Sequence, residues 1–171
     1  MSKIKKQWYE ENPELLEAEK AAMETIAKDD DKEFGFLKDG RAYWHIGFKS
    51  GLSGCYYNVA LMYPTDHPSE KEIPGIRVYP IEPSFEMLVE EMNKASGRND
   101  GYMPYSIRDC NGNYYLSVGS ADWFKRSNTL DSKQGIISAA TVLLETKRWI
   151  IFYEKSVANH GKGFYDLFSI G

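Results

Sequence analysis

Hydrophobic residues recur at helical spacing near both ends of the 171-residue chain, and they alternate with polar residues over its first half. The first pattern predicts helices and the second predicts strands. Residues 13–28 form the first expected helix, because Asn12 is a typical N-cap, Pro13 suits the first turn, and Leu15 and Ala18 begin an apolar stripe. Three consecutive aspartates then mark its end, since negative charge is unfavourable at a helix C-terminus.

Four strands are expected after this helix, at residues 34–37, 43–48, 55–63 and 76–81. Asp39 and Gly40 have the signature of a tight turn between the first two strands. Pro64 ends the third strand, because proline has no N–H to donate to a neighbouring strand. No helical pattern separates these strands, so we expect one antiparallel meander.

Two further helices are expected, at residues 85–95 and 131–159. Asp131 and Gln134 have the spacing of a capping box at the start of the longer one. The order of elements predicts a single α+β domain over residues 1–171: an N-terminal helix, a four-stranded antiparallel meander, an irregular segment and a long C-terminal helix. We expect residues 1–11 to be mobile and a short tail at residues 160–171 to pack back on the domain.

Composition and charge narrow the function classes. The net charge of −4 argues against nucleic-acid binding, which needs clustered lysine and arginine. No stretch has the apolar run of a membrane span, and no signal peptide opens the chain, so the expected location is the cytoplasm. The long helix carries an apolar surface broadened by Trp149, Phe152 and Tyr153, which indicates deep burial, a partner or an oligomer.

Few residues are candidates for disulfide, metal or cofactor chemistry. Cys55 and Cys110 do not make a disulfide scaffold, and Cys55, at the start of a strand, is interpreted as structural. The three histidines and two cysteines are too far apart for metal-ligand spacing, and no glycine-rich phosphate loop is present. We therefore expect neither a metal nor a cofactor.

Several short motifs along the chain have a recognisable order. They are Trp44-His45-Ile46, Tyr63-Pro64 with Pro68, Asn111-Gly112-Asn113-Tyr114-Tyr115-Leu116, and Trp123. Over residues 13–153 this set resembles the ubiquitin-conjugating enzyme family, and the long last helix is more similar to its bacterial members. The resemblance implies the family's fold and, around residue 115, the segment that holds its catalytic cysteine.

The chain departs from the family pattern at that segment. The position aligned with the catalytic cysteine is Tyr115. Met103-Pro104-Tyr105 stands where the family has His-Pro-Asn, so the asparagine that would support the oxyanion is absent as well. The segment at residues 81–101 is also longer than in typical members, and the sequence leaves open whether it covers the site.

Three interpretations of the missing cysteine remain open. In the first, Tyr115 is not a nucleophile, because a phenol has a pKa near 10, and the protein only binds partners. In the second, Ser117 shares a strand face with Tyr115 and forms an oxyester. In the third, Cys110 before the turn is the nucleophile, its pKa lowered by Arg108. The polar groups that could assist Ser117 are Asp109, Asp122, Asn111 and Asn113.

The resemblance implies a ubiquitin-conjugating-enzyme-like protein of a bacterial modifier pathway, with a ubiquitin-like protein and its activating enzyme as partners. Our first hypothesis is transfer of the modifier through an oxyester on Ser117. The alternative is a non-catalytic variant that binds a modifier or a catalytic partner. A third is an α+β domain unrelated to modifiers, which a sheet order different from the meander would favour.

Overall fold

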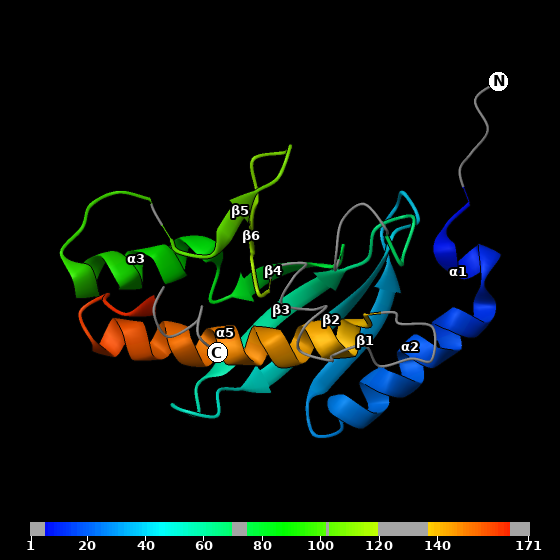
Figure 1. The fold of residues 1–171 in the computed structure, drawn as a ribbon, viewed down its shortest axis with the longest axis horizontal. Coiled ribbons are helices and arrows are strands. Elements are labelled where there is room, and N and C mark those ends of the chain that lie inside the picture. The colour runs from blue at the N-terminus through cyan, green and yellow to red at the C-terminus, as the bar shows by residue number, and fades with distance from the viewer. Residues whose placement is uncertain (1–5, 70–74, 102, 120–136, 165–171) are drawn as a thin grey trace.

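The computed structural model describes residues 6–69, 75–101, 103–119 and 137–164, and it shows an α+β fold (Figure 1). Its helices are α1 (Trp8–Glu11), α2 (Pro13–Ile26), α3 (Phe85–Ser96) and α5 (Ala139–Ala158). Its strands are β1 (Asp31–Phe36), β2 (Ala42–Lys49), β3 (Tyr56–Met62), β4 (Arg77–Glu82), β5 (Ser106–Arg108) and β6 (Tyr114–Leu116). The predicted layout of N-terminal helix, antiparallel meander and long C-terminal helix is confirmed.

The strands form one sheet in the order β1-β2-β3-β4-β6-β5. The first four are the expected meander, with Trp44 of β2 opposite both Phe34 of β1 and Leu61 of β3. Strands β5 and β6 form a hairpin that continues the sheet beyond β4, where Val78 pairs with Leu116. Strand β6 lies within the extended run expected after the Asn-Gly turn. Strand β5 is not anticipated, because its three residues are too short for a periodic signal.

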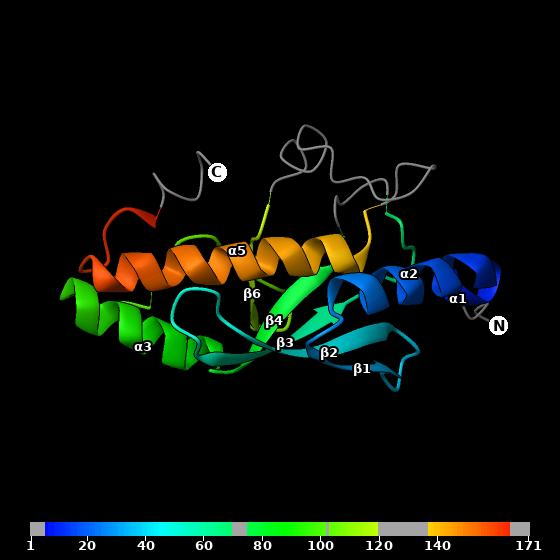
Figure 2. The same ribbon diagram turned by 90° about the horizontal axis from the view of Figure 1, so that it is seen from below.

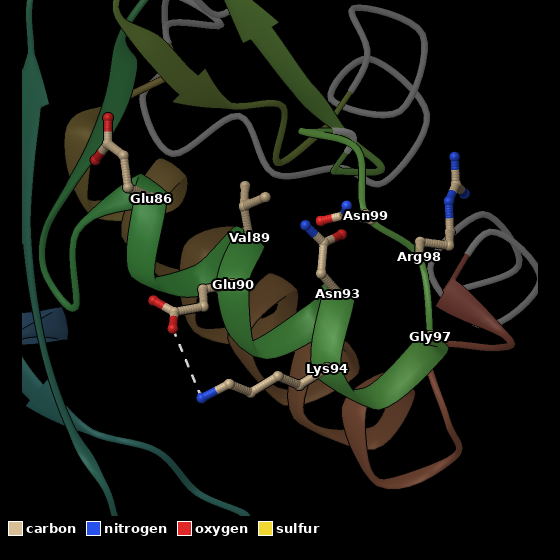
Figure 3. A pocket seen from close by; sticks show the side chains of 8 residues that line it. All are labelled: Glu86, Val89, Glu90, Asn93, Lys94, Gly97, Arg98 and Asn99. Atoms are coloured by element: carbon tan, nitrogen blue, oxygen red, sulfur yellow. Dashed lines mark ion pairs between the residues drawn. The ribbon is translucent and has the colours of Figure 1, made fainter.

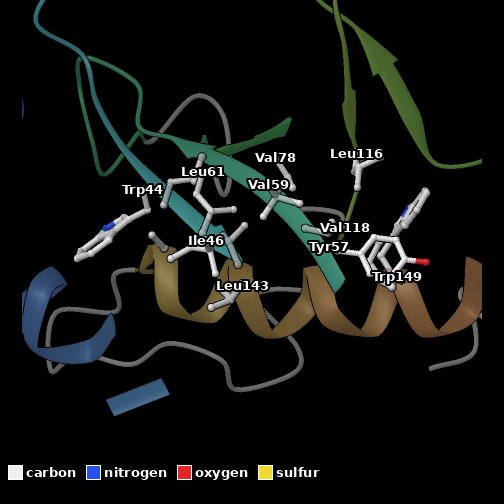
Figure 4. Packing of buried hydrophobic residues seen from close by; sticks show 14 of the residues in the cluster. Trp44, Ile46, Tyr57, Val59, Leu61, Val78, Leu116, Val118, Leu143 and Trp149 are labelled. Carbon is white, nitrogen blue, oxygen red and sulfur yellow. The ribbon is translucent and has the colours of Figure 1, made fainter. Parts of the chain in front are cut away.

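Helix α5 runs along one side of the sheet and contacts α2 near one end and α3 near the other, with α3 lying beyond the end of the sheet (Figure 2). Alternate residues of the strands point into this layer, including Ile46, Val59 and Leu61, and they meet Leu143 and Trp149 of α5 (Figure 4). Each of these five side chains is buried. Burial of this apolar cluster is the main force holding the helices to the sheet.

The opposite side of the sheet is called the open face, since no helix of the described residues packs on it (Figure 2). Its side chains alternate with those of the core along each strand. They are Tyr43, His45, Tyr56, Asn58, Met62, Arg77, Tyr79 and Tyr115. Tyrosine and methionine are enriched in this set, as they are in protein interfaces.

The expected start of α2 is confirmed, because the Asn12 side chain accepts a hydrogen bond from the backbone N–H of Leu15 (3.2 Å). Helix α3 begins after Ser84, whose hydroxyl accepts from Met87 N–H. Helix α5 begins at Ala139 after the N-cap Ser138. The expectation that it begins at residue 131 is wrong, because residues 137 and 138 are not helical; the proposed capping-box residues 131 and 134 lie outside the described residues.

The two termini of the described chain are anchored to the core. Residues 1–11 were expected to be mobile, but Trp8 begins helix α1 and is buried against Tyr63 and His67, with ring centroids 4.8 and 4.9 Å away. At the other end, Phe164 is buried and packs 5.1 Å from Trp149. The packing of the tail is thus seen at residue 164; residues 1–5 and 165–171 lie outside the described residues.

A buried carboxylate connects four parts of the fold. Glu19 Oε1 accepts hydrogen bonds from the Tyr63 hydroxyl (2.6 Å) and from the backbone N–H of Ala139 (3.0 Å), the first residue of α5. Its Oε2 lies 3.0 Å from His67 Nε2. Trp44 Nε1 in turn donates to the Tyr63 hydroxyl (2.9 Å). Glu19 therefore joins α2 to the end of β3, to the proline loop and to the N-terminus of α5.

Two buried tyrosines hold acidic side chains near the other end of α5. Tyr57 donates to Glu154 Oε2 (3.0 Å), and Tyr153 donates to Glu91 Oε2 (3.0 Å) and to the carbonyl of Leu88 (2.9 Å). Burial, followed by the neighbouring carboxylate, raises the pKa of each phenol above the ordinary tyrosine value of 10.0. The folded protein therefore strongly prefers both phenols neutral.

This preference predicts a loss of stability in alkali. Folding raises the pKa of both phenols, so the two neutral tyrosines stabilise the folded protein fully below pH 10.0. Above this pH the tyrosines of the unfolded chain ionise, and the stabilisation is progressively lost. The free energy of unfolding should fall by about 1.4 kcal/mol per pH unit for each tyrosine. Urea unfolding at several alkaline pH values measures the slope. Tyr153→Phe should reduce it, and an unchanged slope after Tyr57→Phe and Tyr153→Phe together would contradict the assignment.

Candidate functional site

The site that the sequence singles out lies on the β5–β6 hairpin, which projects from the sheet beside β4 (Figure 1). Its turn is built by Asp109, whose Oδ1 accepts from the backbone N–H groups of Asn111 and Asn113 (2.9 Å each). Gly112 adopts φ +85°, a left-handed conformation that glycine accepts without steric cost. The predicted Asn-Gly turn is confirmed, and it closes a regular hairpin.

Tyr115, the residue aligned with the catalytic cysteine of the resembled family, lies on the open face and is half-buried. The Arg77 guanidinium lies 4.7 Å from the centre of its ring, and the Tyr79 ring lies 5.8 Å away. A cation over an aromatic face is an attractive contact. The Tyr115 ring is therefore held by packing against Arg77 and Tyr79.

Asp109 extends this cluster to the hairpin turn. Its Oδ2 accepts from the Tyr79 hydroxyl (3.0 Å). Burial opposes ionisation of this carboxyl, but hydrogen bonds from Asn113, Tyr79 and Asn111 outweigh it, and the positive charge of Arg77 adds to them. The pKa of Asp109 consequently lies below its ordinary value. Burial is also the main cause that raises the pKa of Tyr79, so this phenol stays a neutral hydrogen-bond donor.

Ser117 is the nucleophile of our first hypothesis, and it lies at the base of the hairpin. Its backbone N–H donates to the carbonyl of Tyr105 (2.8 Å), and its side chain is half-buried on the same face as Tyr115. Within the described residues, no histidine or carboxylate forms a hydrogen bond with the Ser117 hydroxyl. A serine without a base or an oxyanion hole is a poor nucleophile. The expected contribution of Asp122 lies outside the described residues.

The two cysteines and Asn113 do not join Ser117. Cys110 is exposed at the hairpin tip. Ser117 lies opposite Tyr105 at the base of the hairpin. The last ladder pair before the tip, Arg108 and Tyr114, is three residues further along, so about 10 Å of strand separates Ser117 from the tip that carries Cys110. Asn113 is exposed in the turn with its backbone N–H bound to Asp109. Cys55 precedes β3 and is exposed as well, so its interpretation as a structural thiol is wrong.

The tripeptide Met103-Pro104-Tyr105 has a packing role. Met103 and Pro104 are buried. Tyr105 has φ +53°, and its carbonyl accepts from both Ser117 N–H and Trp149 Nε1 (3.2 Å). This carbonyl therefore couples the base of the hairpin to helix α5. In the resembled family, an asparagine at this position would support the oxyanion.

The segment 81–101 does not lie over Tyr115. It forms α3, which packs on α5 and carries an open groove of about 570 Å³ on its outer side (Figure 3). Glu90 and Lys94 pair with each other along successive turns of α3 (3.6 Å), and Asn93 donates to the carbonyl of Asp100 (2.6 Å). Phe85, which precedes the groove residue Glu86, stacks on Tyr114 of the hairpin (4.6 Å), and the groove shows no convergent reactive groups among the described residues.

Two residues with central contacts were not singled out by the sequence: Arg77 in the site and Glu19 in the core. Arg77 follows a proline-rich loop and gave no motif, although its place two residues before Tyr79 puts both on one strand face. Glu19 lies between Leu15 and Met23 at helical spacing, which is the signal that places it in the core. Among the described residues, no three acidic, histidine or cysteine side chains gather as metal ligands. No described helix is long and apolar enough to cross a membrane.

The fold and the site together define a class: an α+β domain with an antiparallel meander, a sheet face that no described helix covers and a hairpin whose central position is a packed tyrosine. Comparison of the chain with protein-family models, with curated proteins and with solved structures finds no match in any of the three. The likeness to ubiquitin-conjugating enzymes thus consists of the sequence motifs and the order of the elements.

Proposed function

We propose that this chain is a non-catalytic, ubiquitin-conjugating-enzyme-like protein that binds a protein partner on the open face of its sheet. The observation that carries the proposal is the contact of Tyr115 with Arg77, 4.7 Å from the ring centre to the guanidinium. It fills the position of the family's nucleophile with a packed side chain. The partner is a ubiquitin-like protein or a catalytic component of its pathway, such as its activating enzyme.

The open face has the chemistry of a binding surface. It presents tyrosine rings whose hydroxyls donate hydrogen bonds to aspartates: Tyr56 to Asp31 (2.7 Å) and Tyr79 to Asp109 (3.0 Å). Rings fixed in this way lose little conformational entropy on binding, and tyrosine is frequent among energetically dominant interface residues. A cytoplasmic location accompanies the proposal, since both cysteines are free and exposed and would oxidise readily elsewhere.

The first experiment separates binding from catalysis. The protein is incubated with a purified ubiquitin-like protein, its activating enzyme and ATP, and its intact mass is measured. We expect no covalent adduct. An adduct that hydroxide cleaves, that resists thiol and that disappears in Ser117→Ala would instead establish our first hypothesis, an oxyester on Ser117. An adduct cleaved by thiol and lost in Cys110→Ser would place the reaction at the hairpin tip.

The second experiment locates the partner surface with two variants matched in exposure. Tyr56 on the open face and Leu144 on the outer side of α5 are each 47% exposed. We expect Tyr56→Ala to weaken binding of the ubiquitin-like protein or the activating enzyme by about tenfold or more, as for a central interface residue. Leu144→Ala should leave the affinity unchanged. Equal effects of the two variants, or no binding of either protein to the wild type, would contradict the proposal.

A further inference from the structure

The two edges of the sheet differ in length. Strand β5 forms one edge and has three residues, whereas β1 forms the other and pairs all six of its residues, Asp31–Phe36, with β2 in a continuous register. No described helix or strand extends the sheet beyond β1 (Figure 2). A long edge strand without proline or bulge is a template for pairing with another strand. Strand β1 is thus the edge at which this sheet can be extended.

Every second residue of β1 directs its backbone N–H and C=O groups away from β2. In an antiparallel pair, residues that exchange hydrogen bonds alternate with residues that do not. Leu37 N–H donates to the Arg41 carbonyl (2.8 Å), and this bond fixes the alternation, so that Gly35 and Glu33 bond to β2. The outward-facing residues are Lys32, Phe34 and Phe36. No backbone hydrogen bond from another described residue reaches their outward groups.

Strand β1 is not protected in the way that edge strands usually are. Many edge strands carry a lysine whose charge opposes pairing. The lysine of β1, Lys32, is held away from the edge, because its Nζ donates to the carbonyl of Ala27 (3.1 Å) and lies 3.5 Å from Glu24. Phe36 is 53% exposed, although its ring packs 4.9 Å from that of Tyr9. The edge therefore presents outward backbone groups next to an exposed aromatic ring.

The two sides of this edge differ in chemistry. On the helix side, Phe34 and Phe36 offer an apolar surface to every second residue of an added strand. On the open face, Glu33 is exposed and forms no ion pair with a described side chain. The Tyr43 hydroxyl also reaches the edge, because its ring lies across Gly35, where a Cβ atom would be only 2.7 Å from the hydroxyl oxygen. A carboxylate and a phenol favour a lysine or arginine on this side.

We infer that the outer edge of β1 binds an extended peptide segment of a partner protein, as an added antiparallel strand in which apolar residues alternate with lysine or arginine. Main-chain hydrogen bonds to the outward groups supply the affinity, and the alternating side chains supply the sequence preference. Apolar residues opposite Phe34 and Phe36 pack on the helix side, while basic residues opposite Glu33 and Gly35 lie on the open face. This inference does not require the proposed function, because it concerns the edge of the sheet and not its face.

The test is an NMR titration of the ¹⁵N-labelled full chain with a short peptide of alternating valine and lysine, blocked at both ends. We expect saturable shifts with a Kd on the order of 0.1 mM. At saturation, hydrogen exchange of the Lys32, Phe34 and Phe36 amides should slow by about tenfold or more, because each gains an acceptor. The Glu33 and Gly35 amides are already bonded to β2, so their exchange should change little.

Three results would overturn the inference. The first is the absence of a saturable shift at millimolar peptide. The second is equal slowing of exchange at all residues of β1, since an added strand protects only alternate amides. The third is protection of the Lys32, Phe34 and Phe36 amides in the free protein that grows with protein concentration, which would place a second copy of this chain at the edge.

Altered peptides and protein variants separate main-chain pairing from charge. A peptide N-methylated at its valines cannot donate to the outward carbonyls, so it should not bind; binding as tight as that of the parent peptide would exclude strand addition. A peptide with glutamate in place of lysine should bind about tenfold more weakly, and Glu33→Lys should reverse this preference. Glu90→Lys is the matched control, since it changes an exposed glutamate of α3, at the other end of the fold (Figure 1). If Glu33→Lys weakens binding of the lysine peptide no more than Glu90→Lys does, the preference for a basic strand is wrong.

Discussion

Replacing Glu19 by alanine is expected to lower the free energy of unfolding by about 3–5 kcal/mol, a large part of the total for a domain of this size. The carboxylate is buried and accepts from Tyr63 and from the backbone N–H of Ala139, while His67 lies 3.0 Å away. Its removal leaves these polar groups without their partner inside the core, which costs more than the loss of the hydrogen bonds themselves. Urea unfolding followed by circular dichroism measures the change.

The same helix supplies the control for this prediction. Glu17 is exposed on α2, so Glu17→Ala removes a carboxylate of the same kind and should change stability by less than about 0.5 kcal/mol. Glu19→Gln keeps the shape and one acceptor oxygen, and its effect should fall between the two. A loss below about 1 kcal/mol for Glu19→Ala would show that the buried network stabilises neither α2 nor the start of α5.

Replacing Trp149 by alanine is expected to cost about 3–5 kcal/mol, as for other large residues in a packed core. Trp149 is fully buried, stacks on Tyr153 (5.5 Å) and contacts Phe164, while its Nε1 donates to the Tyr105 carbonyl. The substitution leaves a cavity at the point where α5, the tail and the hairpin meet. Chemical unfolding gives the magnitude, and hydrogen exchange of the Ser117 amide reports on the hairpin.

Two variants of α5 test how much of the lost stability comes from the indole hydrogen bond and how much from apolar packing. Trp149→Phe keeps most of the apolar contact but removes the indole donor, so it should cost about 1–2 kcal/mol. Leu144→Ala changes an exposed residue of the same helix and should be nearly neutral. If the Ser117 amide exchanges at the same rate in Trp149→Ala as in the wild type, the coupling of α5 to the hairpin through Tyr105 is wrong.

The elements with a regular pattern were predictable from sequence, and those set by tertiary contacts were not. Asn12 followed by Pro13 gave the start of α2, and alternation gave the four strands of the meander. The start of α5 was misplaced, because Asp131 and Gln134 resemble a capping box while the residue that caps the helix is Ser138. Two candidate caps seven residues apart, Asp131 and Ser138, cannot be ranked without knowing where the apolar face is buried.

In the candidate site, too, local features were predictable from sequence and tertiary contacts were not. The Asn-Gly turn and the extended run after it were predictable, because their chemistry is local. The partners of Tyr115 were not, since Arg77 and Tyr79 come from β4 and meet it only through the sheet order. Cys55 was interpreted as structural at the start of a strand, because free cysteine is often buried, but it is exposed and lies just before β3.

The bond from Glu19 to the backbone of Ala139 joins positions 120 residues apart, and it has a consequence for synthesis. The four strands of the meander pair with their neighbours in sequence, so they can associate as soon as they leave the ribosome. Helix α5, which covers their apolar side, ends at Ala158 and emerges much later. Until then the nascent sheet presents its apolar side to the cell, and contacts of such long range are slow to form. The yield of folded protein should therefore depend on chaperones that bind exposed apolar strands.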